Sequence, residues 1–276
     1  SQTVLSDKRR ISALVSAKPT DVGAFTRIQS GLRTRSVWAG AVMPPPILLA
    51  TRLANRGGLA KRKFPLETLM PEFKALIEGY KRFRADAYRQ QKARYDELAS
   101  DGQAPPVMVI SCCDSRVDPA TIFDTVPGQV FALRNVANLV PPFETGGGLH
   151  GASAAIEFGV LGLGVKHIVV MGHGQCGGIK AALADAKPGP SNNIFIDSWM
   201  GIVRDARDAV ISCQHDDPQR ALEWEAIKVS LANLRTFPFI AEREASGELK
   251  LHGSWFAITE GNLYVLNEAD GSFSLA

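Results

Sequence analysis

Two runs of apolar, largely β-branched residues limit what this chain can fold into. They occupy residues 107–111 and 167–172, and each is followed at once by side chains with reactive groups. Runs of this length and composition predict strands that are buried on both faces, as in a parallel sheet. Because ligands in open α/β sheets bind at the carboxyl ends of such strands, the residues after the two runs are the first candidates for a functional site.

The rest of the chain supplies alternating strands and helices around these two strands. A further strand is predicted at 129–134, and two more at 249–258 and 263–266 form a hairpin. Helical periodicity marks the segments 69–100, 152–163, 179–186, 194–212 and 218–235. The predicted fold class is therefore α/β, with a mostly parallel central sheet, an antiparallel C-terminal edge, flanking helices and an N-terminal helix arm.

Thiols and an imidazole follow the two core strands. Cys112-Cys113-Asp114-Ser115-Arg116 comes after the first, and His173-Gly174-Gln175-Cys176 comes after the second. His173 and Cys176 lie three residues apart at a strand-to-helix turn, so both can converge on one ion together with Cys112. Three protein ligands and an open fourth position are typical of a catalytic zinc site. The chain is thus predicted to bind one Zn²⁺ through Cys112, His173 and Cys176.

The side chains around Cys112 are expected to alternate between two faces. On an extended backbone Cys112, Asp114 and Arg116 share one face, and Cys113 points the opposite way as a small, buried apolar residue. Asp114 then has two alternative roles. It closes the site as a fourth ligand, or Arg116 holds it and leaves room for water.

The charge of such a site predicts its pH dependence. Two thiolates, a neutral imidazole and a hydroxide on Zn²⁺ sum to about −1, whereas three imidazoles and a hydroxide sum to about +1. The more negative site is the weaker Lewis acid, so its water should titrate above roughly 7. We expect activity to rise on the alkaline side of neutral pH, with Asp114 accepting a hydrogen bond from the zinc-bound hydroxide.

These motifs resemble those of the β-class carbonic anhydrases. Cys112-x-Asp114-x-Arg116 resembles the first zinc motif of that family, and His173-x-x-Cys176 resembles the second. The likeness runs from about residue 70 to about residue 267 and includes the segments 134–138, 153–158, 172–178, 233–239 and 251–253. Several ordered motifs over this length are much more specific than one short pattern.

The resemblance implies reversible hydration of CO₂ to bicarbonate and a proton. Cys112, His173 and Cys176 would be the zinc ligands, the dyad of Asp114 and Arg116 would orient the hydroxide, and Asp114 would bind the metal only in a closed state. The family fold implies a homodimer or a higher homo-oligomer, in which the N-terminal helices pack across the partner. No nucleic-acid partner and no membrane span are predicted.

The resemblance also implies a substrate pocket near the subunit interface. In the plant-like branch a Gln, a Phe and a Tyr line that pocket. Gln103 and Phe131 match the first two positions, but Phe158 stands at the third, so a tyrosine hydroxyl is missing there. Val109 occupies a position where the bicarbonate-inhibited branch carries Trp, which argues against that form of regulation.

Three other functions fit parts of the pattern. The same scaffold and zinc could hydrolyse a CO₂ analogue such as CS₂ or COS, and a non-catalytic zinc protein that responds to bicarbonate is a further alternative. The run Gly172-x-Gly174-x-x-Gly177 also fits the dinucleotide fingerprint of an oxidoreductase. A pyrophosphate loop, however, does not favour His and Cys side chains pointing into it.

The first 63 residues differ in composition from the rest of the chain. They contain twelve Lys and Arg residues against two acidic residues, whereas the whole chain has a net charge of +3. A disordered tail, an organelle-targeting segment and a non-native start all fit this basic segment. The prediction divides the chain into a basic tail at 1–63 and a catalytic domain at 64–276. Four cysteines that suit reduced thiols favour a cytoplasmic location, with organelle import through residues 1–63 as the alternative.

Overall fold

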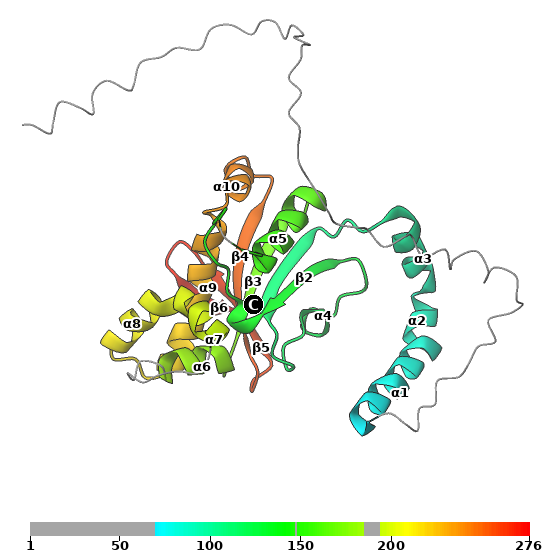
Figure 1. Cartoon of the computed structure of the whole chain (residues 1–276), viewed down its shortest axis with the longest axis horizontal. Coiled ribbons are helices and arrows are strands. Elements are labelled where there is room, and N and C mark those ends of the chain that lie inside the picture. Colours follow the sequence, from blue (N-terminus) through cyan, green and yellow to red (C-terminus); the bar gives the residue numbers. More distant parts are fainter. Residues whose placement is uncertain (1–69, 147, 185–193) are drawn as a thin grey trace, which may run out of the picture. The chain divides into compact units, whose positions relative to one another are not determined.

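A six-stranded sheet forms the centre of the protein (Figure 1). The computed structural model describes residues 70–146, 148–184 and 194–276. The strand order is β2-β1-β3-β4-β5-β6, in which β2, β1, β3 and β4 are parallel and β5 and β6 are antiparallel additions. The strands are β1 (Val107–Cys112), β2 (Val130–Asn135), β3 (His167–His173), β4 (Lys250–Ala257), β5 (Asn262–Asn267) and β6 (Ser272–Leu275). The predicted fold class is therefore confirmed.

The register of the sheet places the two motifs at one edge. Ser111 of β1 pairs with Met171 of β3, and Cys112 pairs with Asn135 of β2. Because these strands are parallel, their carboxyl ends meet, and Cys112 and His173 lie at the last positions of their strands. The predicted clustering of the motifs follows directly from this register.

Helices cover the sheet and connect its strands. The α-helices are α1 (Pro71–Ala85), α2 (Ala87–Gln90), α3 (Lys92–Asp101), α4 (Pro119–Ile122), α5 (Gly151–Glu157), α6 (Gly177–Ala184), α7 (Ile194–Met200), α8 (Arg204–Ser212), α9 (Pro218–Leu234) and α10 (Pro238–Ala245). Short helical turns of other types are η2 (Val136–Asn138), η3 (Phe158–Gly162) and η4 (Gly201–Val203). The predicted helices at 152–163 and 194–212 are each interrupted, because η3 and η4 change the helical winding. The elements α4, α10 and β6 were not predicted, since segments of four to eight residues carry little periodicity.

The helical arm is three helices and not the single helix predicted at 69–100. At Asp86 the backbone leaves the helical region, with φ −120° and ψ −87°, and the Asp86 side chain accepts a hydrogen bond from Gln90 at 2.6 Å. The rings of Phe83, Tyr88 and Tyr95 cluster across the bends, with centroids 5.1 to 6.3 Å apart. These local contacts replace a continuous helix.

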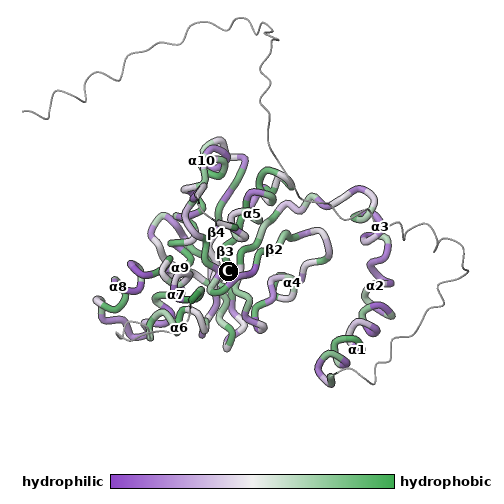
Figure 2. The backbone as a smooth tube through the Cα atoms, viewed as in Figure 1, coloured by the Kyte–Doolittle hydropathy of each residue, from purple (hydrophilic) through white to green (hydrophobic). Residues whose placement is uncertain are grey.

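Every residue of α1 is at least partly exposed, although the helix is amphipathic. Figure 2 shows hydrophobic and hydrophilic residues in turn along its length. Its large exposed side chains include Phe73, Leu76 and Tyr80. In a single chain the apolar side chains of this arm therefore stay exposed, so the covering surface that the sequence predicts for them must come from elsewhere.

The side chain of Ile227 on helix α9 lies directly against two glycines, Gly172 of β3 and Gly253 of β4. A Cβ atom on Gly172 would lie 2.8 Å from Cδ1 of Ile227, and one on Gly253 would lie 2.9 Å from Cγ2 of the same side chain. Real Cβ atoms do not tolerate such contacts, so both positions require glycine at this packing distance. The close approach brings the N-terminal half of α9 next to the end of β3.

The basic segment at 1–63 and its predicted boundary with the following domain lie outside the described residues. None of the helices in the described ranges is both long and apolar enough to cross a membrane.

Candidate metal centre

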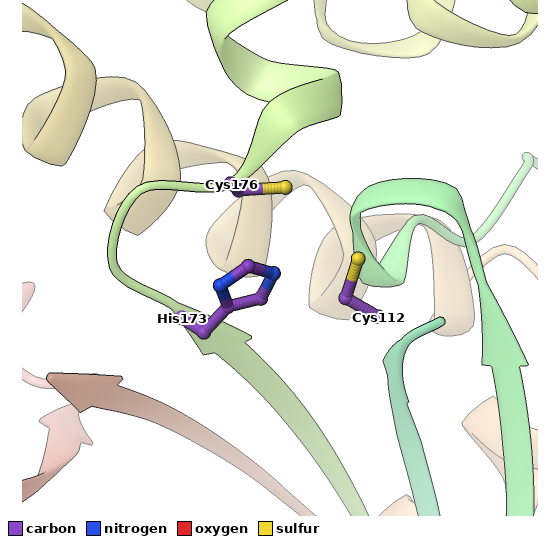
Figure 3. Close-up of side chains that lie close together, drawn as sticks. All are labelled: Cys112, His173 and Cys176. Atoms are coloured by element: carbon purple, nitrogen blue, oxygen red, sulfur yellow. The ribbon is translucent and has the colours of Figure 1, made fainter. Parts of the chain in front are cut away.

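Two thiols and one imidazole converge at the carboxyl edge of the sheet. Candidate ligand atoms of Cys112, His173 and Cys176 all lie within 4.8 Å of one another, and all three residues are buried. Figure 3 shows the three side chains pointing toward a common centre from the end of β1, the end of β3 and the turn before α6. One ion of tetrahedral preference could contact all three.

The hydrogen bond on one ring nitrogen of His173 leaves the other free for a metal. Nδ1 of His173 lies 2.9 Å from the carbonyl oxygen of Gly174. A carbonyl can only accept, so Nδ1 carries the proton and Nε2 presents a lone pair. Within the described ranges the buried Nε2 has no hydrogen-bond partner. An unpaired buried acceptor is costly, and a cation at this position would satisfy it.

The two sulfurs titrate as a pair. Hydrogen bonding between them lowers the pKa of Cys112 and raises the pKa of Cys176, and burial raises the pKa of Cys176 further. The N–H of Ala137 donates to Sγ of Cys112 at 3.4 Å, from a backbone with φ of +62°. One proton of the pair is therefore lost readily, and a bound divalent cation would favour loss of the second.

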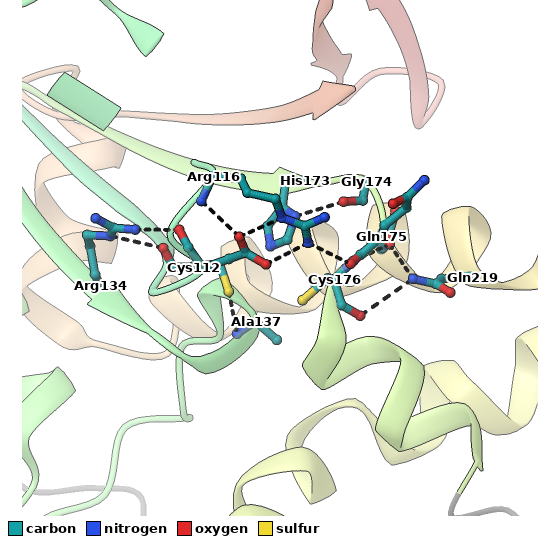
Figure 4. A network of polar contacts seen from close by, with 11 residues as sticks. Cys112, Arg116, Arg134, Ala137, His173, Gly174, Gln175, Cys176 and Gln219 are labelled. Atoms are coloured by element: carbon teal, nitrogen blue, oxygen red, sulfur yellow. Dashed lines mark hydrogen bonds and ion pairs between the residues drawn. The ribbon is translucent and has the colours of Figure 1, made fainter. Parts of the chain in front are cut away.

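Asp114 and Arg116 form a bidentate pair. Figure 4 shows Arg116 close to Cys112 and Cys176. Nε of Arg116 donates to Oδ1 of Asp114 at 2.9 Å, and Nη2 donates to Oδ2 at 2.7 Å. The guanidinium holds the pKa of Asp114 well below its usual range. Arg116 also donates to the carbonyl oxygen of Gln175 at 3.3 Å, so it connects the loop after β1 with the turn that carries Cys176.

Cys113 is exposed, and its predicted burial is wrong. Strand β1 ends at Cys112, and residues 115 and 116 form a turn. Strand alternation therefore does not extend past Cys112. Asp114 and Arg116 lie together because of their mutual hydrogen bonds and not because they share a strand face.

Arg134 and Glu223 support the centre but were not singled out from the sequence. Arg134 donates to the carbonyl oxygen of Cys112 at 3.0 Å and to that of Asp114 at 2.7 Å, which fixes the loop between them. Glu223 accepts a hydrogen bond from the backbone N–H of Cys176 at 2.9 Å. An acidic residue in the buried helical pattern of α9 is the signal that could have identified Glu223.

Comparison with known proteins agrees with the geometry of the centre. A family model described as carbonic anhydrase matches residues 107–263, more than half of the chain. Over 188 residues the chain is 38% identical to beta carbonic anhydrase 5, chloroplastic, of Arabidopsis thaliana. The chain belongs to the β-class carbonic anhydrase family. The resemblance of the motifs to this family is thereby confirmed.

The match to the Arabidopsis protein covers 67% of this chain and 61% of that protein, so the chain spans about three fifths of the relative's length. Among solved structures, the β-carbonic anhydrase CcaA is similar with a TM-score of 0.68 and 29% identity, over 74% of this chain and 92% of that one. A tetrameric β-carbonic anhydrase of Sordaria macrospora is similar with a TM-score of 0.62 and 28% identity, over 72% and 98% of the two chains.

The three residues matched to the substrate pocket of the β-carbonic anhydrases do not meet the metal centre within one chain. Gln103 is exposed in the loop between α3 and β1. On β2, Asn135 pairs with Cys112 of the metal centre. Phe131 lies four residues before Asn135, which is roughly 13 Å away along the strand. Phe158 packs against Phe131, with ring centroids 5.9 Å apart, and is 54% exposed.

Proposed function

We propose that this protein catalyses the reversible hydration of CO₂ to bicarbonate and a proton, as a zinc-dependent carbonic anhydrase (carbonate dehydratase). The observation that carries the proposal is the juxtaposition of two thiols, a free Nε2 lone pair and a bidentate Asp–Arg pair. A purely structural metal site would not require the charged pair beside it. Family membership supports the same reaction.

The donor set supports zinc as the metal. Two cysteine sulfurs and one histidine nitrogen are the ligand types that Zn²⁺ prefers, and three protein donors leave a fourth position for water. Zn²⁺ bound there would supply Lewis acidity that makes water a nucleophile close to neutral pH. Cys112, His173 and Cys176 are the proposed ligands.

Asp114 is proposed to orient the nucleophile through its remaining hydrogen-bonding capacity. Its two oxygens accept three hydrogen bonds, from the backbone N–H, Nε and Nη2 of Arg116. An ionised carboxylate offers about four lone-pair sites, so one is left to accept a proton-bearing group. This arrangement supports the open alternative, in which Arg116 keeps Asp114 available as an acceptor.

A second copy of the chain is proposed to complete the substrate pocket. Phe131 and Phe158 lie far along the sheet from the metal centre of their own chain, yet Phe158 is exposed beside the edge strand β2. A homodimer could bring these rings, together with the exposed Gln103, against the partner's metal centre. The tetrameric Sordaria macrospora protein supports an oligomer as well.

Hydrolysis of CS₂ or COS is the alternative that shares this centre, and parallel assays separate the two. Zinc-loaded protein is expected to hydrate CO₂ in a stopped-flow indicator assay and to release no H₂S from CS₂ above the Cys112→Ser background. Release of H₂S without CO₂ hydration would contradict the proposal. The dinucleotide alternative has less support, because the side chains of His173 and Cys176 point from this turn toward Cys112 (Figure 3), whereas a pyrophosphate would need bare backbone there.

We also propose that the chain divides into a basic segment at 1–63 and a catalytic domain at 64–276. The basic segment is proposed to direct import into an organelle. The segment is rich in basic residues and poor in acidic ones, and the Arabidopsis relative is named chloroplastic. Residues 1–63 fused to a fluorescent protein are expected to direct it into an organelle. Diffuse cytoplasmic fluorescence would contradict import.

A further inference from the structure

One buried carboxylate near the metal centre has no role in the proposed chemistry. Glu223 lies on α9, is only 3% exposed, and takes part in no ion pair within the described ranges. Its Oε1 accepts from the backbone N–H of Cys176 at 2.9 Å and from Nε2 of Gln219 at 3.1 Å. Its Oε2 accepts from Nε1 of Trp255 at 3.1 Å.

The three partners of Glu223 indicate that it is a carboxylate and not a neutral acid. The backbone amide, the side-chain amide and the indole are all donors, whereas a protonated carboxyl would need an acceptor for its own proton. Burial raises the pKa of Glu223 above its usual value, and the hydrogen bonds from Cys176, Gln219 and Trp255 offset only part of that rise. A buried charge satisfied by three donors is costly to assemble, which argues that its position has a use.

The contact with Cys176 falls at the end of a constrained turn. Gln175 has a φ of +57°, an uncommon conformation for a residue other than glycine. The N–H of Gly174 donates to the carbonyl oxygen of Phe256 at 2.9 Å, and Arg116 donates to Gln175. Glu223 supplies the next contact along the chain, at the residue whose sulfur faces Cys112.

The fold places Glu223 at this point through the close packing of α9. Glu223 and Ile227 are four residues apart, so they lie on the same face of the helix. Ile227 fits against Gly172 and Gly253 only because neither has a side chain. A wider separation of α9 from β3 would move the carboxylate away from the Cys176 amide.

We propose that Glu223 is a positioning residue, which holds the backbone of Cys176 so that its sulfur is aimed at the metal. The inference deepens the proposed function and rests on it, since it assumes that Cys176 is a ligand. Glu223 acts through the Cys176 amide and touches neither the metal nor the substrate. Groups that orient metal ligands in this way typically change metal affinity by about 10- to 100-fold when they are replaced.

Glu223→Gln is the sharpest variant, because it keeps the shape and replaces one acceptor oxygen by a donor NH₂ group. Either Trp255 or Cys176 then loses its acceptor. Glu225→Gln is the matched control, since Glu225 lies on the same helix and pairs with Lys228 at the surface. Zinc affinity is measured by competition with a chelator, and the thiolate-to-metal absorption of the Co²⁺ protein reports the sulfur geometry.

The expected result is a zinc dissociation constant about 10- to 100-fold higher for Glu223→Gln, with a changed Co²⁺ spectrum, and wild-type values for Glu225→Gln. A merely structural role would lower the unfolding midpoints of the metal-free and metal-loaded proteins equally. A positioning role reduces the difference between the two midpoints. Wild-type affinity and spectrum in Glu223→Gln would overturn the inference.

Two further outcomes separate this inference from the proposed function. Wild-type protein that holds zinc but does not hydrate CO₂ would contradict the function alone, whereas wild-type protein that binds no zinc would contradict both. If Glu223→Gln does not fold, hydrogen exchange of the Cys176 amide in the wild-type zinc protein decides. Slow exchange supports the contact, and exchange at the rate of an open turn overturns it.

Discussion

At the scale of single residues, the adjacent cysteines Cys112 and Cys113 have different surroundings because strand β1 ends between them. Cys112 is the last residue of β1 and is buried, and its sulfur lies close to the ligand atoms of His173 and Cys176. Cys113 is the first residue beyond the strand and is exposed. Their side chains are chemically identical, so the pair offers an internal control for the metal site.

Cys112→Ser is expected to lower the zinc content well below one ion per chain, because a serine hydroxyl is a poor zinc ligand. A catalytic metal stabilises the transition state by several kcal/mol. Its loss is therefore expected to lower the rate of CO₂ hydration by at least about 100-fold. Cys113→Ser should keep both zinc and activity. Metal analysis and stopped-flow hydration check this, and full zinc in Cys112→Ser would contradict the ligand assignment.

The Asp–Arg pair makes a separate prediction about pH. Arg116 holds the pKa of Asp114 below its usual range, so the ion pair is lost only as pH falls through that lowered value, far below 6. The carboxylate therefore stays ionised between pH 6 and 9 and cannot cause a change in rate there. Activity is expected to rise on the alkaline side of neutral because the water titrates, and a flat profile would contradict this.

Asp114→Asn tests the orienting role of the carboxylate at constant metal content. Loss of a correctly oriented acceptor is expected to reduce hydration about 100-fold while the zinc content stays at the wild-type level. Asp124→Asn is the control nearby in the sequence, since Asp124 is exposed and forms no ion pair within the described ranges. Equal activity of Asp114→Asn and wild type, compared by stopped flow, would remove Asp114 from the mechanism.

Residue patterns predict parts of this centre for identifiable reasons. Cys112 and His173 each end a strongly apolar strand, so the fold itself brings them together. Cys113 was misplaced because alternation holds only inside a strand. The sequence pattern does not single out Glu223, because a charged residue in a helix usually faces water. The buried Ile227, one turn later, shows that Glu223 instead lies on the face of α9 that packs against the sheet.

At the scale of the elements, the distance between α9 and the sheet determines where Glu223 lies relative to the metal centre. Ile227 lies between Gly172 and Gly253, and Glu223 lies one turn before it. The helix could be predicted from its period, but its distance from β3 could not, since that distance depends on which strand residues lack a side chain. The bends of the helical arm likewise depend on aromatic contacts that periodicity does not reveal.

Gly172→Ala is expected to destabilise the protein by about 1–3 kcal/mol, because the added Cβ overlaps Cδ1 of Ile227. Adding Ile227→Val removes that atom and should restore part of the loss, measured by chemical denaturation. The single variants and the double variant together form a cycle, and simple additivity of the two effects would contradict the proposed contact.

At the scale of the whole molecule, the arm formed by α1 needs a second surface. Its apolar side chains are exposed in the single chain, and the substrate-pocket residues lie far from their own metal centre. A partner was predicted from the resemblance, because one sequence shows an unpaired apolar face but does not show what covers it. Both features agree with the proposed homodimer.

Leu76→Glu tests this arrangement, since Leu76 is 69% exposed on α1. If the partner buries it, replacement by a charge is expected to weaken association at least about tenfold, as the burial of one leucine stabilises by about 1.5–3 kcal/mol. Glu78→Gln on the same helix should leave association unchanged. Sedimentation at several concentrations checks both, and an unaltered Leu76→Glu dimer would contradict the role of the arm.

The most direct test is stopped-flow CO₂ hydration of metal-free wild-type protein titrated with Zn²⁺. The expected hydration rate rises in proportion to added zinc and levels off at one ion per chain, as one catalytic zinc centre per chain requires. Protein that holds one zinc per chain and shows no hydration above the uncatalysed rate would contradict the proposed function.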